Sequence, residues 1–150
     1  MKTILILLTM IFRHASADDS QHGRYISLYS FEQTVDRLKT VLKEKNIKVF
    51  CIIDHAGEAT QAGLDLRPTR LFIIGNPKVG TALMQEDQET GIDLPLKVLV
   101  YSDKDGHTIV LYKKLLPIAD ARQLKNTHKV AATIDSSMNV LIKHVSQERP

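Results

Sequence analysis

The chain has 150 residues, of which 43% are hydrophobic and 25% charged; this composition fits one ordinary globular domain and excludes a fibrous or disordered chain. Tryptophan is absent and aromatic residues make up 5% of the chain, so stacking platforms for single-stranded nucleic acid are not expected. The formal net charge is only +3 and no Lys/Arg cluster accompanies it, which argues against a nucleic-acid partner.

Residues 1–17 have the pattern of an export signal. Lys2 precedes an apolar run from Thr3 to Phe12, and Ala15-Ser16-Ala17 supplies the small residues that signal peptidase recognises. The run is shorter than the roughly 20 residues that a membrane-spanning helix needs. We therefore expect cleavage near Ala17, a periplasmic or secreted location, and one mature domain at residues 18–150 with no membrane span. An uncleaved anchor, or an N-terminal strand or helix retained in the domain, is the alternative.

The first elements of the mature domain are a strand and an amphipathic helix. Residues Tyr25 to Tyr29 fit a strand, and Ser30 followed by Gln33 is a capping-box signature for a helix start. Asn46 is suited to end this helix in a left-handed turn. Apolar residues spaced four, three and four apart predict its buried stripe: Phe31, Val35, Leu38 and Leu42.

Lys48 to Ile53 is predicted to be the next strand, central in its sheet because its apolar residues would face both sides. It contains Cys51, the single cysteine, so no intrachain disulfide can form. Its apolar neighbours favour inert burial over pairing with another chain or a nucleophilic role.

A short helix and a third strand follow. Glu58 to Ala62 fits the helix, and Gly63 would end it by accepting a positive φ. Pro68 leads into the continuous apolar run Leu71 to Ile74, which is typical of a buried strand.

The remaining chain predicts one more helix, a hairpin and a long terminal helix. Lys78 to Thr90 fits a helix ending at Gly91, and Leu94 to Tyr101 a strand with Pro95 at its beginning. A turn at Asp103-Lys104-Asp105-Gly106 then joins this strand to the next, Thr108 to Tyr112. The last helix carries an apolar stripe of Val130, Ile134, Met138, Leu141 and Val145.

Short motifs in one order now support a family resemblance. They are Asp54-His55, Ala59, Gly63, Leu66, Pro68-Thr69, Gly75-Asn76-Pro77, Gly80-Thr81 and Leu94-Pro95-Leu96-Lys97. Over roughly Tyr25 to Val145 the chain resembles the Domain of Unknown Function 302 family. The resemblance implies an α/β (α+β) domain with a mostly antiparallel, curved sheet of about five strands and helices packed on one side, similar to the TATA-binding-protein fold. It also implies a homodimer in some members, and no reaction.

Gly75-Asn76-Pro77-Lys78-Val79-Gly80-Thr81 is the first candidate site, because its glycines and threonine have the spacing of a phosphate loop. The lysine that such a loop needs after the second glycine is missing, which argues against nucleotide hydrolysis. A weaker hypothesis is that helix-start amides bind a carboxylate or phosphate with help from Lys78 or Lys97. The simpler interpretation is a turn specified by glycine and proline.

Asp54 and His55 are the only weak catalytic candidates, since strand ends often present functional groups. Adjacent strand residues point to opposite faces, so the pair would need the chain to turn between them. The simpler interpretation is that Asp54 caps the short helix and His55 lies near its N-terminus.

The sequence gives no clear metal or cofactor motif. The histidines are His14, His22, His55, His107, His128 and His144, and none has a His-x-x-x-His or His-Glu-x-x-His spacing. The turn at Asp103-Lys104-Asp105-Gly106 starts like a calcium loop but lacks the closing glutamate. We predict no cofactor, with noncovalent haem and a metal site built from distant residues left open.

Two functional hypotheses remain. The first is a noncatalytic module that binds a small molecule or a protein partner, acts as a homodimer and has a pocket between sheet and helices, with Asn76, Lys78, Thr81 and Lys97 as polar contacts. The second is a hydrolase or lyase with His55 as general base aided by Asp54. A cleft in which Asp54, His55 and Lys78 converge would favour the enzyme, whereas a largely apolar cavity would favour binding.

Overall fold

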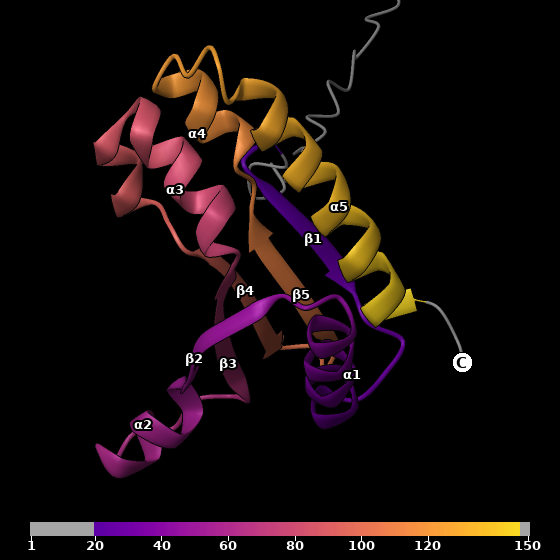
Figure 1. The fold of residues 1–150 in the computed structure, drawn as a ribbon. Coiled ribbons are helices and arrows are strands. Elements are labelled where there is room, and N and C mark those ends of the chain that lie inside the picture. The colour runs from indigo at the N-terminus through magenta and orange to yellow at the C-terminus, as the bar shows by residue number, and fades with distance from the viewer. Residues whose placement is uncertain (1–19, 148–150) are drawn as a thin grey trace, which may run out of the picture.

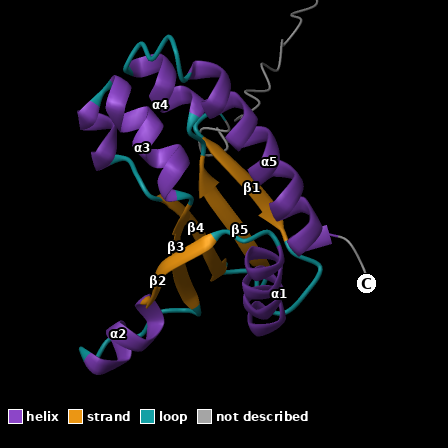
Figure 2. Cartoon of the chain, in the orientation of Figure 1, coloured by secondary structure: helices purple, strands orange, loops and turns teal. Residues whose placement is uncertain are grey.

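A computed structural model describes residues 20–147, which form a five-stranded antiparallel sheet with helices (Figure 2). The strand order is β1-β5-β4-β3-β2, so β1 and β2 are the two edges. The strands are β1 (His22–Ile26), β2 (Lys48–Asp54), β3 (Thr69–Gly75), β4 (Leu96–Ser102) and β5 (Thr108–Lys113). The predicted α+β class with an antiparallel sheet is confirmed, and the likeness to the TATA-binding-protein fold stays a prediction.

The helices connect and cover these strands (Figure 1). They are α1 (Phe31–Glu44), α2 (His55–Gln61), α3 (Pro77–Glu86), the 3-10 helix η1 (Gln88–Ile92), α4 (Leu116–Ala121) and α5 (His128–Gln147). In Figure 1, α1 and α5 lie in front of the sheet, while α3 and α4 lie together near one end. No helix in the described part of the chain is long and apolar enough to cross a membrane.

Helix α1 forms as the sequence predicts. Ser30 caps it, and the side chain of Gln33 accepts a hydrogen bond from the Ser30 amide in return, which completes a capping box. The helix ends at Glu44, and Asn46, two residues later, has the predicted left-handed backbone with a φ of 52°. Its predicted stripe packs against the central strands and α5 in the main core. The buried members of this core are Val35, Leu38, Val41, Leu42, Phe72, Ile74, Val98, Val100, Val110, Tyr112, Met138, Leu141, Ile142 and Val145.

A second, smaller core lies between α3, α4 and α5. Its buried members are Leu83, Leu115, Ile118, Ala119, Leu124 and Ala131. Ile134 of α5 and Leu96 of β4 pack against both cores, so the two are neighbours in space. Helix α4, which belongs to this core, was not predicted from the sequence. Of the stripe predicted for α5, Val130 is exposed, whereas its neighbour Ala131 is buried.

The prediction that β2 is central and that Cys51 is buried is wrong. The strand order places β2 at an edge, where β3 is its one partner, and the Cys51 side chain is exposed. An apolar run therefore does not guarantee that both faces are covered. Figure 1 shows α2 projecting from the rest of the domain.

Other predicted boundaries shift for local reasons. The predicted helix from Lys78 to Thr90 is broken at Asp87, whose extended backbone and side chain cap η1 instead. The predicted strand from Leu94 begins at Leu96, after a cis Leu94–Pro95 peptide bond. The first strand begins at His22 and ends at Ile26.

Helix α2 starts at His55, three residues before the predicted Glu58, because Asp54 caps it; Gly63 follows it with a φ of 73°, as predicted. The hairpin between β4 and β5 is also confirmed, with Gly106 at a φ of 84°. The predicted export signal at residues 1–17 lies outside the described residues.

Candidate ligand-binding site

A cavity of about 520 Å³ lies between the sheet, α3 and α5, at the turn that joins β3 to α3. Its walls are almost entirely apolar, and its few polar groups are small side chains. The lining comes from β2 and the residue before it, the β3–α3 turn, α3, the segment before β4, the residue before α4, and α5. The residues are Ile47, Phe50, Ile74, Gly75, Asn76, Pro77, Val79, Gly80, Thr81, Leu83, Met84, Gly91, Leu94, Pro95, Leu96, Leu115, Thr133, Ile134, Ser137 and Met138. The sequence predicted a pocket between sheet and helices, with Asn76 and Thr81 among its polar contacts.

The turn residues have specific structural roles at the cavity. Asn76 caps α3, its side-chain oxygen accepting a hydrogen bond from the Lys78 amide at 3.0 Å, and Pro77 occupies the first helical position. A Cβ atom at Gly75 would lie 3.4 Å from the Phe50 ring, an ordinary contact distance, so the ring packs directly against this glycine. The turn therefore shapes the wall of the cavity.

The structure brings only two of the four predicted ligand-binding residues to the cavity. Asn76 and Thr81 line it, whereas Lys78 and Lys97 are not among the lining residues. The Lys97 ammonium instead donates hydrogen bonds to the carbonyl oxygens of Asp93 at 3.2 Å and Pro95 at 3.1 Å.

The anion-binding hypothesis for this turn has little geometric support. Proline at the first helical position has no N–H group, and the Lys78 amide is bonded to Asn76. The amides of Val79 and Gly80 both donate to the Asn76 carbonyl oxygen, at 3.1 and 3.0 Å. An anion at this helix start would find its donors already engaged.

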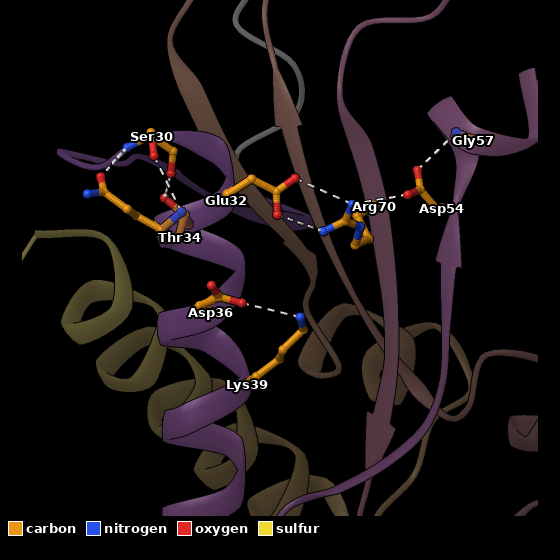
Figure 3. A network of polar contacts seen from close by, with 9 residues as sticks. Ser30, Glu32, Thr34, Asp36, Lys39, Asp54, Gly57 and Arg70 are labelled. Carbon is orange, nitrogen blue, oxygen red and sulfur yellow. Dashed lines mark hydrogen bonds and ion pairs between the residues drawn. The ribbon is translucent and has the colours of Figure 1, made fainter. Parts of the chain in front are cut away.

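Asp54 and His55 lie apart from the cavity, at the far end of β2. The Asp54 carboxylate accepts a hydrogen bond from the Gly57 amide at 3.0 Å and pairs with Arg70 at 3.0 Å (Figure 3). The Gly57 amide, followed by Arg70, holds the pKa of Asp54 below its usual range. No hydrogen bond or ion pair joins Asp54 to His55 in the described part of the chain, so the geometry is that of a helix cap.

Arg70 also links this strand end to α1. Its guanidinium pairs with Glu32 at 3.1 Å, so one arginine on β3 joins the first turn of α1 to the cap of α2 (Figure 3). The guanidinium carbon lies 5.2 Å from the centre of the Phe31 ring. Arg70 therefore has a structural role, which sequence reasoning did not identify.

One carboxylate that sequence reasoning also missed joins the end of α3 to the start of α5, two helices that contribute to the cavity wall. Glu86, at the end of α3, accepts hydrogen bonds from the amides of Lys125, Asn126 and Thr127 and from the Thr127 hydroxyl, all just before α5. Of these, the Asn126 amide contributes most and the Thr127 hydroxyl next, and together they lower the pKa of Glu86 to about 2. The contact joins residues about forty positions apart, so the sequence carries no local signal for it.

One group of potential metal ligands exists among the described residues. The ligand atoms of Asp103, Asp105 and His107 lie within 4.8 Å of one another in the hairpin between β4 and β5. Asp103 already accepts hydrogen bonds from the amides of Asp105 and His107, at 2.9 and 2.8 Å. These bonds stabilise the turn, which agrees with the hairpin interpretation.

The fold and this site define a class: a single α+β domain with a five-stranded antiparallel sheet and an apolar cavity between sheet and helices. The chain belongs to the family described as "Domain of unknown function DUF302", whose model matches residues 24–145.

A solved structure supports the same fold. The uncharacterized conserved protein DUF302 from Bacillus stearothermophilus is 21% identical, with a TM-score of 0.75 over 83% of this chain and 97% of that one. At this identity the likeness concerns the fold alone.

Two relatives of higher sequence identity come from Brucella species. "Fluoride-specific ion channel FluC 1" of Brucella suis biovar 1 (strain 1330) is 34% identical over 128 residues, which are 85% of this chain and 48% of that protein. The protein of the same name from Brucella abortus biovar 1 (strain 9-941) is also 34% identical, over 85% of this chain and 45% of its own length. This chain thus spans about half the length of these relatives.

Proposed function

We propose that this protein is a noncatalytic module that binds a small apolar molecule in the cavity beside α3. The observation that supports this is the cavity itself, whose volume of about 520 Å³ falls within the roughly 300–1,000 Å³ typical of small-molecule sites. The exported location and the homodimer expected from the sequence are part of the same proposal.

The wall chemistry favours a neutral or weakly polar ligand. Asn76, Thr81, Thr133 and Ser137 are the polar side chains of the lining, and none carries a charge. The two lysines expected to attract an anion are not in the lining. A hydrocarbon chain or ring with one hydrogen-bonding group therefore fits best, its apolar part against the isoleucine, leucine and methionine side chains.

The alternative of a hydrolase or lyase with His55 as general base has less support. In the described residues no hydrogen bond or ion pair joins Asp54 to His55, and the Asp54 carboxylate is bonded to Gly57 and Arg70. The converging cleft of Asp54, His55 and Lys78 that would favour catalysis is replaced by an apolar cavity lined by other residues. If a hydrolytic or lyase activity were found, its loss in His55→Ala would restore this hypothesis.

The names of the relatives favour a second candidate function, in which this domain assists a membrane channel. Those proteins are named fluoride-specific ion channels and are about twice as long as the matched segment. Fluoride is a small, strongly hydrated anion, so an apolar cavity would not be its site. A role in fluoride resistance would thus be that of an accessory domain, and deletion of the gene should then increase sensitivity to fluoride in the growth medium.

The binding proposal is tested with a neutral apolar probe, N-phenyl-1-naphthylamine, whose fluorescence rises in an apolar site. Gly80 lies on the cavity wall, and an added Cβ would meet only Leu94 there, at an ordinary contact distance of 3.7 Å. Gly80→Leu should therefore fill the cavity and abolish saturable binding, while Gly80→Ala, the matched control, should keep it.

Both variants should retain the wild-type circular dichroism spectrum, since Gly80 lies within a helix where alanine and leucine are favoured. Saturable binding that Gly80→Leu leaves unchanged would contradict a site in this cavity. The absence of any saturable probe binding by the wild-type protein would contradict the apolar ligand.

A further inference from the structure

The outer edge of β2 has no partner in the described part of the chain. β3 pairs with one edge of β2 from Lys48 to Asp54, and β2 ends the sheet. No described turn, loop or side chain forms a hydrogen bond with the backbone of residues 48–53. Such an edge is a template for pairing with another strand.

The side chains of this edge are unusually apolar for a strand facing water. Phe50 and Ile52 are each 42% exposed, and Cys51 between them is exposed as well. β2 has no proline and just one lysine, at its first position, so it lacks most of the devices that keep edge strands apart. The other edge strand, β1, is shorter and is packed against α5, with Tyr25 bonded to Asn139.

The residues of β2 are arranged so that the strand can pair antiparallel with a second copy of itself. In an antiparallel pair of two β2 strands centred on Cys51, Lys48 lies opposite Asp54 of the other copy. Val49 then faces Ile53, and Phe50 faces Ile52. Every cross-strand pair is therefore either apolar with apolar or positive with negative, which is the pairing that stabilises antiparallel strands.

We propose that a second copy of this chain pairs with the outer edge of β2, antiparallel and with the two-fold axis at Cys51. The two sheets then join into one, and the interface is the same patch on both copies, as two-fold symmetry requires. The charge complementarity of Lys48 with the partner's Asp54 sets the register. This interface deepens the homodimer of the proposed function and rests on it.

The bulge in β2 is compatible with this pairing. The register of β2 against β3 shifts between Val49 and Cys51, so Phe50 is the extra residue. A bulge increases the local right-handed twist of the strand. A second β2 strand that pairs there would follow this twist, so the joined sheet would be strongly twisted at the interface.

Pairing would also connect the dimer to the cavity. The Phe50 ring lies against Gly75 on the cavity wall, and Phe50 is 42% exposed. The partner's Ile52 would cover part of this exposed surface. We therefore expect dimerisation to shield one wall of the cavity from water.

The first test is sedimentation equilibrium of the purified protein over a range of concentrations. Lys48→Glu would place like charges opposite each other twice per dimer and should raise the dimer dissociation constant at least about tenfold. Ile52→Lys would bury a charge against the partner's Phe50 and should do the same. The matched controls are Lys129→Glu, at an exposed site on α5, and Leu64→Lys, at a side chain that is 65% exposed beyond α2; neither should change it.

The second test uses Cys51 as a reporter of the axis. Directly opposite residues in antiparallel strands have Cα atoms about 4.5–5.5 Å apart, which suits a disulfide. Oxygen with copper phenanthroline should therefore oxidise wild-type protein to a linked dimer, seen on a non-reducing gel. Cys51→Ser should give no linked species yet still dimerise, and Lys48→Glu should reduce the linked fraction.

The outcomes separate this interface from the rest of the proposed function. A dimer that neither Lys48→Glu nor Ile52→Lys weakens would overturn the β2 interface and leave the homodimer, through the other sheet edge or a sheet face. A monomer at all concentrations would overturn both, while the probe titration would still decide ligand binding independently.

Discussion

Replacing Gly23 by alanine should destabilise the protein, although alanine is normally the better residue in a strand. Gly23 of β1 lies directly opposite Tyr112 of β5, whose side chain is only 3% exposed. A Cβ atom added at Gly23 would overlap the Tyr112 ring and lie 2.7 Å from its hydroxyl oxygen. The ring therefore covers the glycine, and burial, with the negative charges that Tyr25 and Asp135 would carry, raises the pKa of the Tyr112 phenol to about 12.

The expected cost follows from overpacking. Forcing an extra carbon into a filled site typically costs about 1–3 kcal/mol, because the ring or the short edge strand must shift. For a domain of this size each kcal/mol lowers the melting temperature by roughly 2–4 °C, so Gly23→Ala should lower it by about 2–12 °C. Gly80→Ala, where the added Cβ would have room, is the matched control and should be neutral or stabilising by up to about 1 kcal/mol.

A double-mutant cycle with Tyr112→Leu, followed by thermal and urea unfolding, isolates the contact. Without the ring, Gly23→Ala should become neutral or stabilising, which gives a coupling free energy within the usual range of about 0.5–3 kcal/mol. If Gly23→Ala alone were neutral, or if its cost were the same in the Tyr112→Leu background, the inference that the ring occupies this site would be refuted.

Three further predictions concern ligand class, pH and helix capping. Straight-chain alcohols should bind with a dissociation constant that falls up to about fourfold per added methylene until the cavity is full, measured by calorimetry, and a flat series would contradict an apolar site. The folded-state pKa of Glu86, about 2, lies below its ordinary 4.5, so its stabilising contribution is complete above pH 4.5 and is lost as the pH falls through 2. The difference in melting temperature between wild type and Glu86→Gln should therefore shrink over this window, and a constant difference would argue against the assigned contacts. Ser30→Ala removes the capping box and should lower the free energy of unfolding, measured with urea, by about 0.5–2 kcal/mol. An unchanged urea midpoint would contradict this prediction.

The sequence correctly predicted features that depend on interactions between residues only a few positions apart. The capping box at Ser30 and Gln33 was right because both partners belong to one helical turn. The positive φ angles of Asn46 and Gly106 were right because they follow from residue type and turn position. For the same reason the apolar stripe of α1 identified its buried face.

The candidate site was predictable only in part. Asn76 and Thr81 were predicted as polar contacts of a pocket, and both line the cavity. The roles of Lys78 and Lys97 were not predictable, because side chains of this length reach several neighbours and the sequence does not say which. The cap that Glu86 supplies to residues 125–127 depends on α3 and α5 meeting in space.

The sequence by itself determined most of the helices, the turns and the membership of a family, since each rests on short-range patterns or on motifs in a fixed order. The antiparallel sheet was an expectation from the family resemblance. Only the tertiary structure decided that β2 is an edge strand, that Cys51 is exposed and that an apolar cavity remains between the sheet and α3. The physical reason is that strand order is set by which apolar faces cover one another over the whole chain. A run such as Val49 to Ile53 has the same hydrophobicity at an edge as at the centre of a sheet.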